Sequence, residues 1–352
     1  METSPEPLPH KRRQRYSGKN PRKFEEKYKE HRPESYPETF QKVLDSGKTP
    51  AGSHRPILVQ EILQILRPQP GEVCVDATLG YGGHTCEILR LLRPAGRLIG
   101  LDIDPIELPR TEARLRLLGF GEEEFTAVHA NYAAMNQVLN SLSLPAADLI
   151  LADLGISSMQ LDNPARGLSY KSEGPLDLRM NPGKGSPAWE FLANLDQEKI
   201  VEILIENADE PYARLIAPIL IEDRARNGLR TTSLLAASVR RGLQSLPKQL
   251  RDQEGDAPIR RVFQAIRIAV NQEFATLEAF LRVVPQVLNP GGRVAILTFH
   301  SGEDRRVKKA FQDHARSGVY REINDPVIRA SAEEVRANPR ASSAKLRWAI
   351  KA

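Results

Sequence analysis

The stretch Val73-Cys74-Val75-Asp76-Ala77-Thr78-Leu79-Gly80-Tyr81-Gly82-Gly83-His84 decides the fold class of this 352-residue chain. Its apolar start predicts a buried strand, its glycines predict a tight turn, and the residues that follow predict a helix. Glycine lets the backbone approach a ligand closely, and the amides that open the helix point at that ligand. Asp102 ends the next apolar run, 19 residues after Gly83, where a carboxylate can accept hydrogen bonds from ribose hydroxyls. The pattern predicts an adenosine-binding site; a glycine loop that only makes a tight turn is the alternative.

Further apolar runs extend this unit into a sheet. Short apolar runs that alternate with helical segments are typical of parallel strands covered by helices on both faces. Such a sheet binds its ligand beyond the carboxyl ends of its strands. The predicted strands are Val73–Val75, Leu98–Leu101, Phe125–Val128, Leu149–Ala152 and Val294–Thr298.

The spacing of these strands is irregular in one place. Between Gly155 and Val294 lie 138 residues, whereas a strand–helix–strand unit needs roughly 30. Apolar residues at three- and four-residue steps from Phe263 to Leu288 predict one long helix, ended by Asn289-Pro290-Gly291-Gly292. The remaining residues, 161–260, have the size of a small inserted domain. Apolar periodicity predicts helices there at Ile200–Ile205, Tyr212–Ile221 and Leu234–Leu243.

Composition limits the class of protein. Hydrophobic residues make up 40% and charged residues 27%, as in ordinary globular proteins, and no apolar run is long enough to span a membrane. Cys74 and Cys86 are too few for a disulfide framework or an all-cysteine metal site. We therefore expect a cytoplasmic protein without membrane association and without a bound metal. A monomer and a homodimer remain equally open.

Charge is concentrated at the N-terminus. The chain has a net charge of +5, and residues 1–35 hold ten Lys/Arg against six Glu. Seven of the basic residues lie at positions 10–23, which contain no acid. We expect residues 1–52 to form a flexible basic extension, with the folded part starting near Ser53. Such an extension can neutralise RNA phosphates or simply remain solvated.

The glycine spacing helps to choose among adenosine cofactors. A dinucleotide site usually reads Gly-x-Gly-x-x-Gly, and no third glycine follows Gly80 and Gly82 in that register. S-adenosylmethionine has no phosphate, and its methionyl ammonium favours a carboxylate such as Asp76. His84 alone is more often a polar residue at a helix start than a ligand.

Several longer motifs carry a resemblance to one family. They are Asp153-Leu154-Gly155-Ile156-Ser157-Ser158-Met159-Gln160-Leu161-Asp162, Arg166-Gly167-Leu168-Ser169-Tyr170, Gly174-Pro175-Leu176-Asp177-Leu178-Arg179-Met180, Phe263-Gln264-Ala265-Ile266-Arg267-Ile268, Phe299-His300-Ser301-Gly302-Glu303-Asp304-Arg305 and Asn338-Pro339-Arg340. From about His54 to Arg347 the chain resembles the bacterial ribosomal RNA small subunit methyltransferase H family, also called MraW. Three N-terminal stretches resemble, more weakly, the extended versions found in cyanobacteria and plastids; they are Arg15-Tyr16-Ser17-Gly18, Phe24-Glu25-Glu26-Lys27-Tyr28 and Thr49-Pro50-Ala51-Gly52.

The resemblance implies a fold and an activity. The fold would be α/β: a Rossmann-like class I methyltransferase with a parallel central sheet, formed by residues 53–160 and 261–352, and an inserted, mostly helical substrate-recognition domain at 161–260. The activity would be methyl transfer from S-adenosylmethionine to the exocyclic amino nitrogen of a cytidine in the decoding centre of 16S rRNA, in the small ribosomal subunit. The cofactor contacts that the resemblance implies are Gly82, Gly83, His84, Asp102, Tyr132, Asp153 and Gln160, beside Asp76 and Gly80 from the loop pattern.

Three positions depart from the family pattern. Gly302 stands where leucine is usual, which we expect to loosen the turn after the last predicted strand. Ser342 stands where arginine is common, and Tyr132 where phenylalanine is frequent, which keeps an aromatic ring for stacking. No cofactor carboxylate is lost.

The amino group of cytosine is a poor nucleophile, because its lone pair is delocalised into the ring. Methyl transfer needs an acceptor for the amine proton and a platform that orients the base. We expect Asp153, or a nearby backbone carbonyl, to accept from the amine, and Tyr132, Tyr170 or Phe299 to stack on the base. The candidate catalytic residues are Asp153, His300, Ser301 and Asp304.

Some of these residues have simpler roles open to them. Ser301 with Asp304 also resembles a helix capping box. Asp177 and Arg179 suit a structural ion pair as well as an RNA contact. Candidate phosphate contacts are the N-terminal extension, Arg224, Arg226, Arg230, Arg240, Arg241, Arg305, Arg306, Lys308 and Lys309.

Two other classes of protein fit parts of the pattern. A non-catalytic ribosome-assembly protein predicts damage to the glycine loop or its carboxylates, which is not seen. An NAD-dependent oxidoreductase is disfavoured by the glycine spacing.

Overall fold

The computed structural model describes residues 56–352. The predicted basic extension at 1–52, and the expected start of the folded part near Ser53, lie outside the described residues. Among residues 56–352, no helix combines the length and the apolar character that crossing a bilayer requires.

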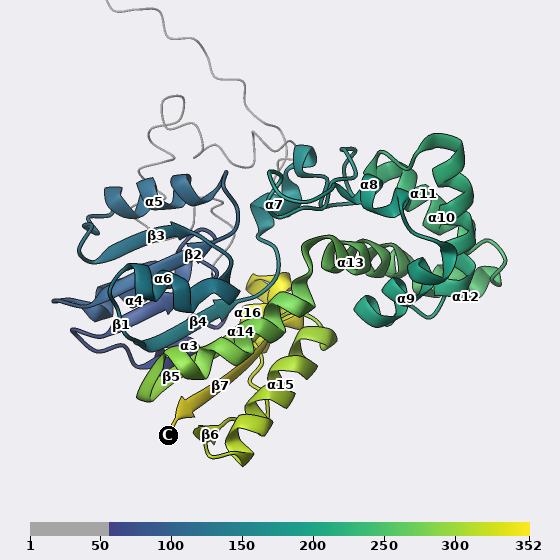
Figure 1. Cartoon of the computed structure of the whole chain (residues 1–352). Helices are drawn as coiled ribbons and strands as arrows, with labels where there is room; N and C mark the ends of the chain where they lie inside the picture. The colour runs from purple at the N-terminus through teal and green to yellow at the C-terminus, as the bar shows by residue number, and fades with distance from the viewer. Residues whose placement is uncertain (1–55) are drawn as a thin grey trace, which may run out of the picture.

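A seven-stranded sheet forms the centre of the larger lobe, in the order β3-β2-β1-β4-β5-β7-β6 (Figure 1). Neighbouring strands from β1 to β5 are parallel, whereas β7 runs antiparallel to both β5 and β6. The five predicted strands are confirmed, and the predicted α/β fold with them. The bounds are β1 (Val73–Asp76), β2 (Arg97–Asp102), β3 (Phe125–His129), β4 (Ala147–Asp153), β5 (Leu288–Thr298), β6 (Tyr320–Ile323) and β7 (Lys345–Lys351).

Helices cover both faces of the sheet, as continuous apolar strands require. One face packs on α3 (Val59–Leu66), α4 (Gly83–Leu92) and α5 (Leu108–Leu117), with α16 (Ala332–Ala337) and the short η4 (Pro339–Ser343) at its edge. The other face packs on η2 (Tyr132–Ala134), α6 (Met135–Ser141), α14 (Glu273–Val287) and α15 (Ser301–Arg316). Alternate strand residues serve the two cores: Val75 and Ile150 face one, Cys74 and Leu149 the other. Burying each such large apolar side chain contributes about 1.5–3 kcal/mol.

The segment between β4 and α14 forms a second lobe beside the sheet (Figure 1). It contains α7 (Ser158–Asp162), η3 (Pro164–Arg166), α8 (Ala188–Ala193), α9 (Gln197–Ala208), α10 (Ala213–Asn227), α11 (Thr232–Gly242), α12 (Lys248–Glu254) and α13 (Ala257–Asn271). Its apolar side chains form their own core, from Leu168 to Ile266. The helices predicted from periodicity are therefore present, and this core extends into α13. Domain limits at 161 and 260 stay a prediction.

The single long helix predicted from Phe263 to Leu288 is wrong. Gln272 adopts a left-handed conformation, with φ of 51°, and divides the segment into α13 and α14. The apolar period continues across the break because α13 packs on the inserted core and α14 on the sheet. Residues Asn289 to Gly292, predicted to end the helix, lie within β5.

Candidate active site

A cavity of about 490 Å³ lies at the carboxyl ends of the parallel strands. The loop after β1, the ends of β2 and β4 and the loop after β3 line one part of it. The ends of α13 and α14 and the start of α15 line the other part. The cavity therefore lies where the sheet lobe meets the inserted lobe, in the place that an open parallel sheet uses for its ligand.

The glycine loop after β1 lines the first part of the cavity, where the sequence predicts the cofactor. Gly80 has φ of 49° and its amide donates to Oδ2 of Asp102 at 2.8 Å. Gly82, with φ of 63°, precedes the first turn of α4, and a Cβ there would lie 3.1 Å from Leu115 and 3.2 Å from Thr111 of α5. Gly80 and Gly83 line the cavity, whereas Gly82 packs against α5.

Asp102 lies at the end of β2, as the sequence predicts for a ribose acceptor. Its Oδ1 accepts from the amide of Asp104 at 2.8 Å, so backbone amides hold both carboxylate oxygens. Burial raises the pKa of Asp102, and these backbone hydrogen bonds oppose the rise. The carboxylate is thus fixed in position beside the glycine loop before any ligand arrives.

Asp76 is placed differently from the expected contact with the methionyl ammonium. It is buried, and its carboxylate accepts from the Thr85 hydroxyl at 2.6 Å and from the Thr78 amide at 3.1 Å. Burial raises its pKa to about 6. It is not among the described residues that line the cavity. Its position behind the loop fits a role in shaping the loop through Thr78 and Thr85.

His84 and Asp153 both line the cavity and lie next to each other. Nε2 of His84 lies 2.9 Å from the carbonyl oxygen of Ile57, and Nδ1 lies 3.6 Å from Oδ2 of Asp153. A carbonyl accepts only, so Nε2 carries the proton and Nδ1 of neutral His84 presents a lone pair to Asp153. Burial lowers the pKa of His84, which favours this neutral form. Burial, together with the charge of Glu303, raises the pKa of Asp153 to about 7.

His300 and Glu303 occupy the start of α15. His300 is the N-cap, and its Nδ1 accepts from the Glu303 amide. Its Nε2 lies 3.2 Å from Oε1 of Glu303, while Oε2 accepts from the Phe299 amide at 2.9 Å. Burial opposes ionisation of Glu303, but His300, the Phe299 amide and Arg267 outweigh it and lower its pKa. Glu303 is therefore a fixed negative charge beside Asp153.

Two predicted catalytic residues lie elsewhere, and we correct that prediction. Ser301 is exposed and donates to Asp209 of the inserted lobe, and Asp304 pairs with Arg347 and Lys345 of β7. Neither is among the described residues that line the cavity. In the first turn of a helix, side chains point in different directions, so only His300 and Glu303 of this segment face the cavity.

Tyr132 and Gln160, which we expect to contact the cofactor, both line the cavity. The ring of Tyr132 packs edge-on against Phe280, with centroids 5.1 Å apart. Both polar atoms of the Gln160 side chain bond to other protein groups. Oε1 accepts from the Ser157 amide at 2.9 Å, and Nε2 donates to Asp104 at 2.7 Å. Of the predicted stacking rings, Phe299 also lines the cavity, whereas Tyr170 packs on Phe263 in the inserted core.

Gly302, which we expect from the sequence to loosen the turn after the last predicted strand, lies in a tightly packed position. A Cβ at this position would lie 2.5 Å from the Phe274 ring and 3.3 Å from Nδ1 of His300. The guanidinium of Arg306 also packs over the Phe274 ring, 3.6 Å from the ring centre. The glycine therefore makes room for Phe274 rather than loosening the turn.

Sequence reasoning missed Arg267 and Glu273, which line the second part of the cavity. The guanidinium donates from Nε and Nη2 to the two oxygens of Glu273 at 2.8 and 2.9 Å. Arg267 stood inside a quoted motif, but the two residues face each other only because the helix breaks at Gln272. The family motif was a signal that could have found Arg267, and no quoted motif includes Glu273.

A family model described as the MraW methylase family matches residues 51–352. This chain belongs to that family. A ribosomal RNA small subunit methyltransferase H 1 of Lachnoclostridium phytofermentans is 49% identical over 344 residues, 97% of this chain and 93% of that protein. A ribosomal RNA small subunit methyltransferase H 2 of Alkaliphilus metalliredigens is 49% identical over 342 residues, 97% of each. Relatives with an N-terminal extension of this kind thus occur outside cyanobacteria and plastids.

Membership of the MraW family makes the chain an S-adenosylmethionine-dependent methyltransferase, and the cavity fits that cofactor. The cofactor carries a sulfonium, an ammonium and a carboxylate, and its net positive charge favours a negatively charged site. The carboxylates that line the cavity outnumber the arginines; they are Asp102, Glu107, Asp153, Glu273 and Glu303, against Arg267 and Arg340. The volume also matches a ligand of this size.

Proposed function

We propose that this chain methylates the exocyclic N4 of one cytidine in the decoding centre of 16S rRNA, within the small ribosomal subunit. Methylation of small-subunit rRNA follows from the relatives, which are named for it. The choice of an amino nitrogen is supported by Asp153, a carboxylate with a pKa near 7 at the end of β4. We also propose that the enzyme acts in the cytoplasm.

Asp153 would supply the acceptor that the cytosine amine needs. S-adenosylmethionine, when bound, supplies an electrophilic methyl group on its sulfonium. Ionised Asp153 accepts a hydrogen bond from N4, which directs the nitrogen lone pair away from the ring, and it takes the proton that N4 loses. The lone pair of His84 Nδ1, 3.6 Å from Oδ2, then faces the protonated carboxyl. Phe299 and Tyr132, which both line the cavity, offer faces or edges against the base.

The basic residues of the described chain differ in their fitness for phosphate contact. Arg224 donates to the carbonyls of Leu192 and Leu195, and Arg241 pairs with Glu222 and Asp223. Asp177 and Arg179 form a two-bond ion pair within the inserted lobe. Lys308 and Lys309 of α15 are exposed, and within residues 56–352 no carboxylate pairs with them. We propose these two lysines as phosphate contacts.

The test is methyl transfer from tritiated S-adenosylmethionine to unmethylated small subunits, followed by nucleoside analysis. We expect label in N4-methylcytidine, and a loss of at least about 100-fold in Asp153→Ala, because a general base contributes about 10²–10⁴-fold. Asp252→Ala, an exposed carboxylate on α12, is the matched control and should behave as the unaltered enzyme. Label in another nucleoside would refute the target, and near-normal transfer by Asp153→Ala would refute the role of Asp153.

A further inference from the structure

The guanidinium of Arg267 is clamped at the wall of the cavity. Its side chain is 12% exposed, and Glu273, itself 10% exposed, holds it through two parallel hydrogen bonds. The two residues come from opposite sides of the helix break at Gln272. Such a fork-shaped pair fixes the plane of the guanidinium as well as its position.

One nitrogen of this guanidinium is left over. Nε and Nη2 bond to Glu273, and among the described residues Nη1 has no acceptor. Nη1 is also absent from the buried polar atoms that lack a partner, so it reaches open space, and Arg267 lines the cavity. Because the clamp fixes the plane of the guanidinium, the two N–H groups of Nη1 also have a fixed direction.

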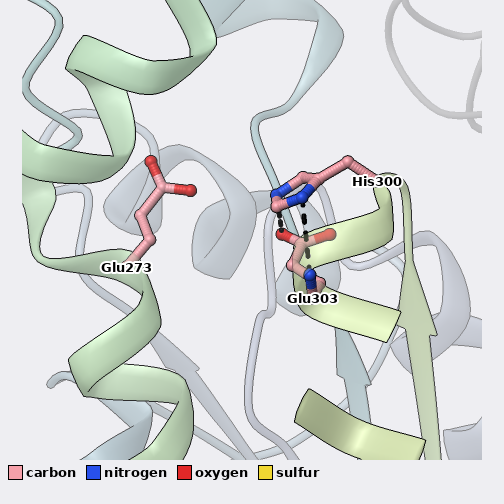
Figure 2. Close-up of side chains that lie close together, drawn as sticks. All are labelled: Glu273, His300 and Glu303. Atoms are coloured by element: carbon pink, nitrogen blue, oxygen red, sulfur yellow. Dashed lines mark hydrogen bonds and ion pairs between the residues drawn. The ribbon is translucent and has the colours of Figure 1, made fainter. Parts of the chain in front are cut away.

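Glu273 also belongs to a group of side chains, with His300 and Glu303, whose residue types could hold a metal ion. Figure 2 shows Glu273 projecting from α14 toward His300 and Glu303 of α15, and one ligand atom from each lies within 4.8 Å of the others. Arg267, however, occupies both oxygens of Glu273 and already supplies a positive charge there. The arrangement is better suited to a neutral organic group with hydrogen-bond acceptors.

Cytosine presents such acceptors next to its reactive amine. On its pairing edge, N4 donates, while N3 and O2 accept; uracil has an acceptor at position 4 and a donor at N3. Asp153, Arg267 and Glu303 all line this cavity, and the charge of Glu303 acts on the pKa of both Asp153 and Arg267. A base whose N4 faces Asp153 turns its acceptors toward further groups of that wall.

We propose that Arg267 reads the target base: Nη1 donates to N3 of the cytosine, and Glu273 positions the guanidinium for that bond. This inference rests on the proposed cytidine target. This pair of side chains selects cytosine over uracil. In uracil, the acceptor O4 would face the acceptor oxygens of Asp153, and the donor N3–H would face the N–H donors of Arg267. A hydrogen bond to a charged group of this kind changes binding or rate by about 10- to 100-fold.

The test combines an altered enzyme with an altered base. Small subunits are assembled with cytidine or with 3-deazacytidine, which lacks the N3 acceptor, at the target position. The unaltered enzyme should lose about 10- to 100-fold in kcat/KM on the analogue. Arg267→Ala should lose as much on cytidine and little more on the analogue, so the two losses are not additive. Any change in the intrinsic reactivity of the amine affects both enzymes equally and cancels.

Control variants separate this role from a structural one. Arg261→Ala removes another ion-paired arginine of α13, which bonds to Glu210 and Glu254 and does not line the cavity. It should lose the same factor as the unaltered enzyme on the analogue. Glu273→Gln keeps the fold contact but loosens the clamp, so it should reduce kcat/KM on cytidine and weaken the discrimination. Arg267→Lys serves the same test should Arg267→Ala fail to fold.

Several outcomes would overturn the proposal. Additive losses in Arg267→Ala would show that N3 and Arg267 do not meet. A loss of S-adenosylmethionine affinity in calorimetry, matching the loss of activity, would assign Arg267 to the cofactor. Binding of Mn²⁺ or Zn²⁺ that Glu273→Gln abolishes would assign Glu273 to a metal. If the unaltered enzyme fails on unmodified subunits, the proposed function itself is at fault instead.

Discussion

Among the single residues, Asp153 must be ionised to accept a proton and must also hold that proton once it has accepted it. It ends β4 with Oδ2 3.6 Å from Nδ1 of His84, and burial with the charge of Glu303 raises its pKa to about 7. A surface carboxylate would be fully ionised near pH 7 and would hold a proton only weakly there. Asp153 is instead able to take a proton and release it near neutrality, which suits a general base.

This pKa predicts the pH dependence of methyl transfer. The carboxylate must be ionised to accept from the amine, and its pKa is raised, so the rate should fall as the pH drops below about 7. Glu303→Gln removes a negative charge that raises the pKa of Asp153, so the fall should move to lower pH. Single-turnover rates between pH 5.5 and 8.5 with saturating cofactor measure both. An unchanged midpoint in Glu303→Gln would show that Glu303 does not influence the reacting carboxylate.

At the scale of elements, one buried cluster joins the inserted lobe to the cofactor part of the site. Asp104 follows β2 and is almost fully buried, and its Oδ2 accepts from Gln160 of α7 and from Arg166 of η3, each at 2.7 Å. Arg166 also donates to the carbonyl of Met180 at 2.7 Å. Asp104 in turn donates its amide to Asp102. The carboxylate expected to hold the ribose is therefore connected to the entry of the inserted lobe.

Breaking this cluster should be costly. Arg166→Ala leaves the Asp104 carboxylate buried without its partner, which should lower the free energy of unfolding by about 3–5 kcal/mol. Arg90→Ala, which removes an ion pair with Glu87 in which the arginine is 47% and the glutamate 32% exposed, should cost less than about 1 kcal/mol. Urea unfolding of both variants measures the difference. Similar losses in the two variants would contradict a special role for Asp104, and the Arg166→Met, Asp104→Asn double variant should recover part of the loss.

At the scale of the whole molecule, the active site is shared between two cores. The sheet lobe contributes the glycine loop, Asp102 and Asp153, and α13 of the inserted lobe contributes Arg267. The candidate phosphate contacts Lys308 and Lys309 lie on α15 of the sheet lobe. Residues 1–55, which hold most of the excess positive charge, are outside the described residues.

The basic stretch at 10–23 predicts a salt effect on RNA binding. Replacing its seven Lys/Arg by Gln should weaken binding to small subunits and reduce the slope of log K against log salt concentration. Each phosphate contact contributes about 0.7–0.9 to that slope, so the reduction should be about 5 to 6 when all seven residues contact phosphates. Filter binding at several salt concentrations measures it, and calorimetry with S-adenosylmethionine serves as the control for folding. An unchanged slope would mean that the stretch stays solvated when RNA binds.

Local patterns in the sequence were enough to predict the parallel strands, the glycine loop with Asp102 and an inserted helical segment. Buried parallel strands are continuous apolar runs, and a loop that approaches a ligand needs glycine, so both leave local signals. Only the tertiary structure decided which polar side chains face the cavity. It turned Asp76, Ser301 and Asp304 toward other partners, and through the break at Gln272 it brought Arg267 and Glu273 together. The reason is physical: periodicity records which face of an element is apolar, whereas the direction of a polar side chain depends on what packs beside it.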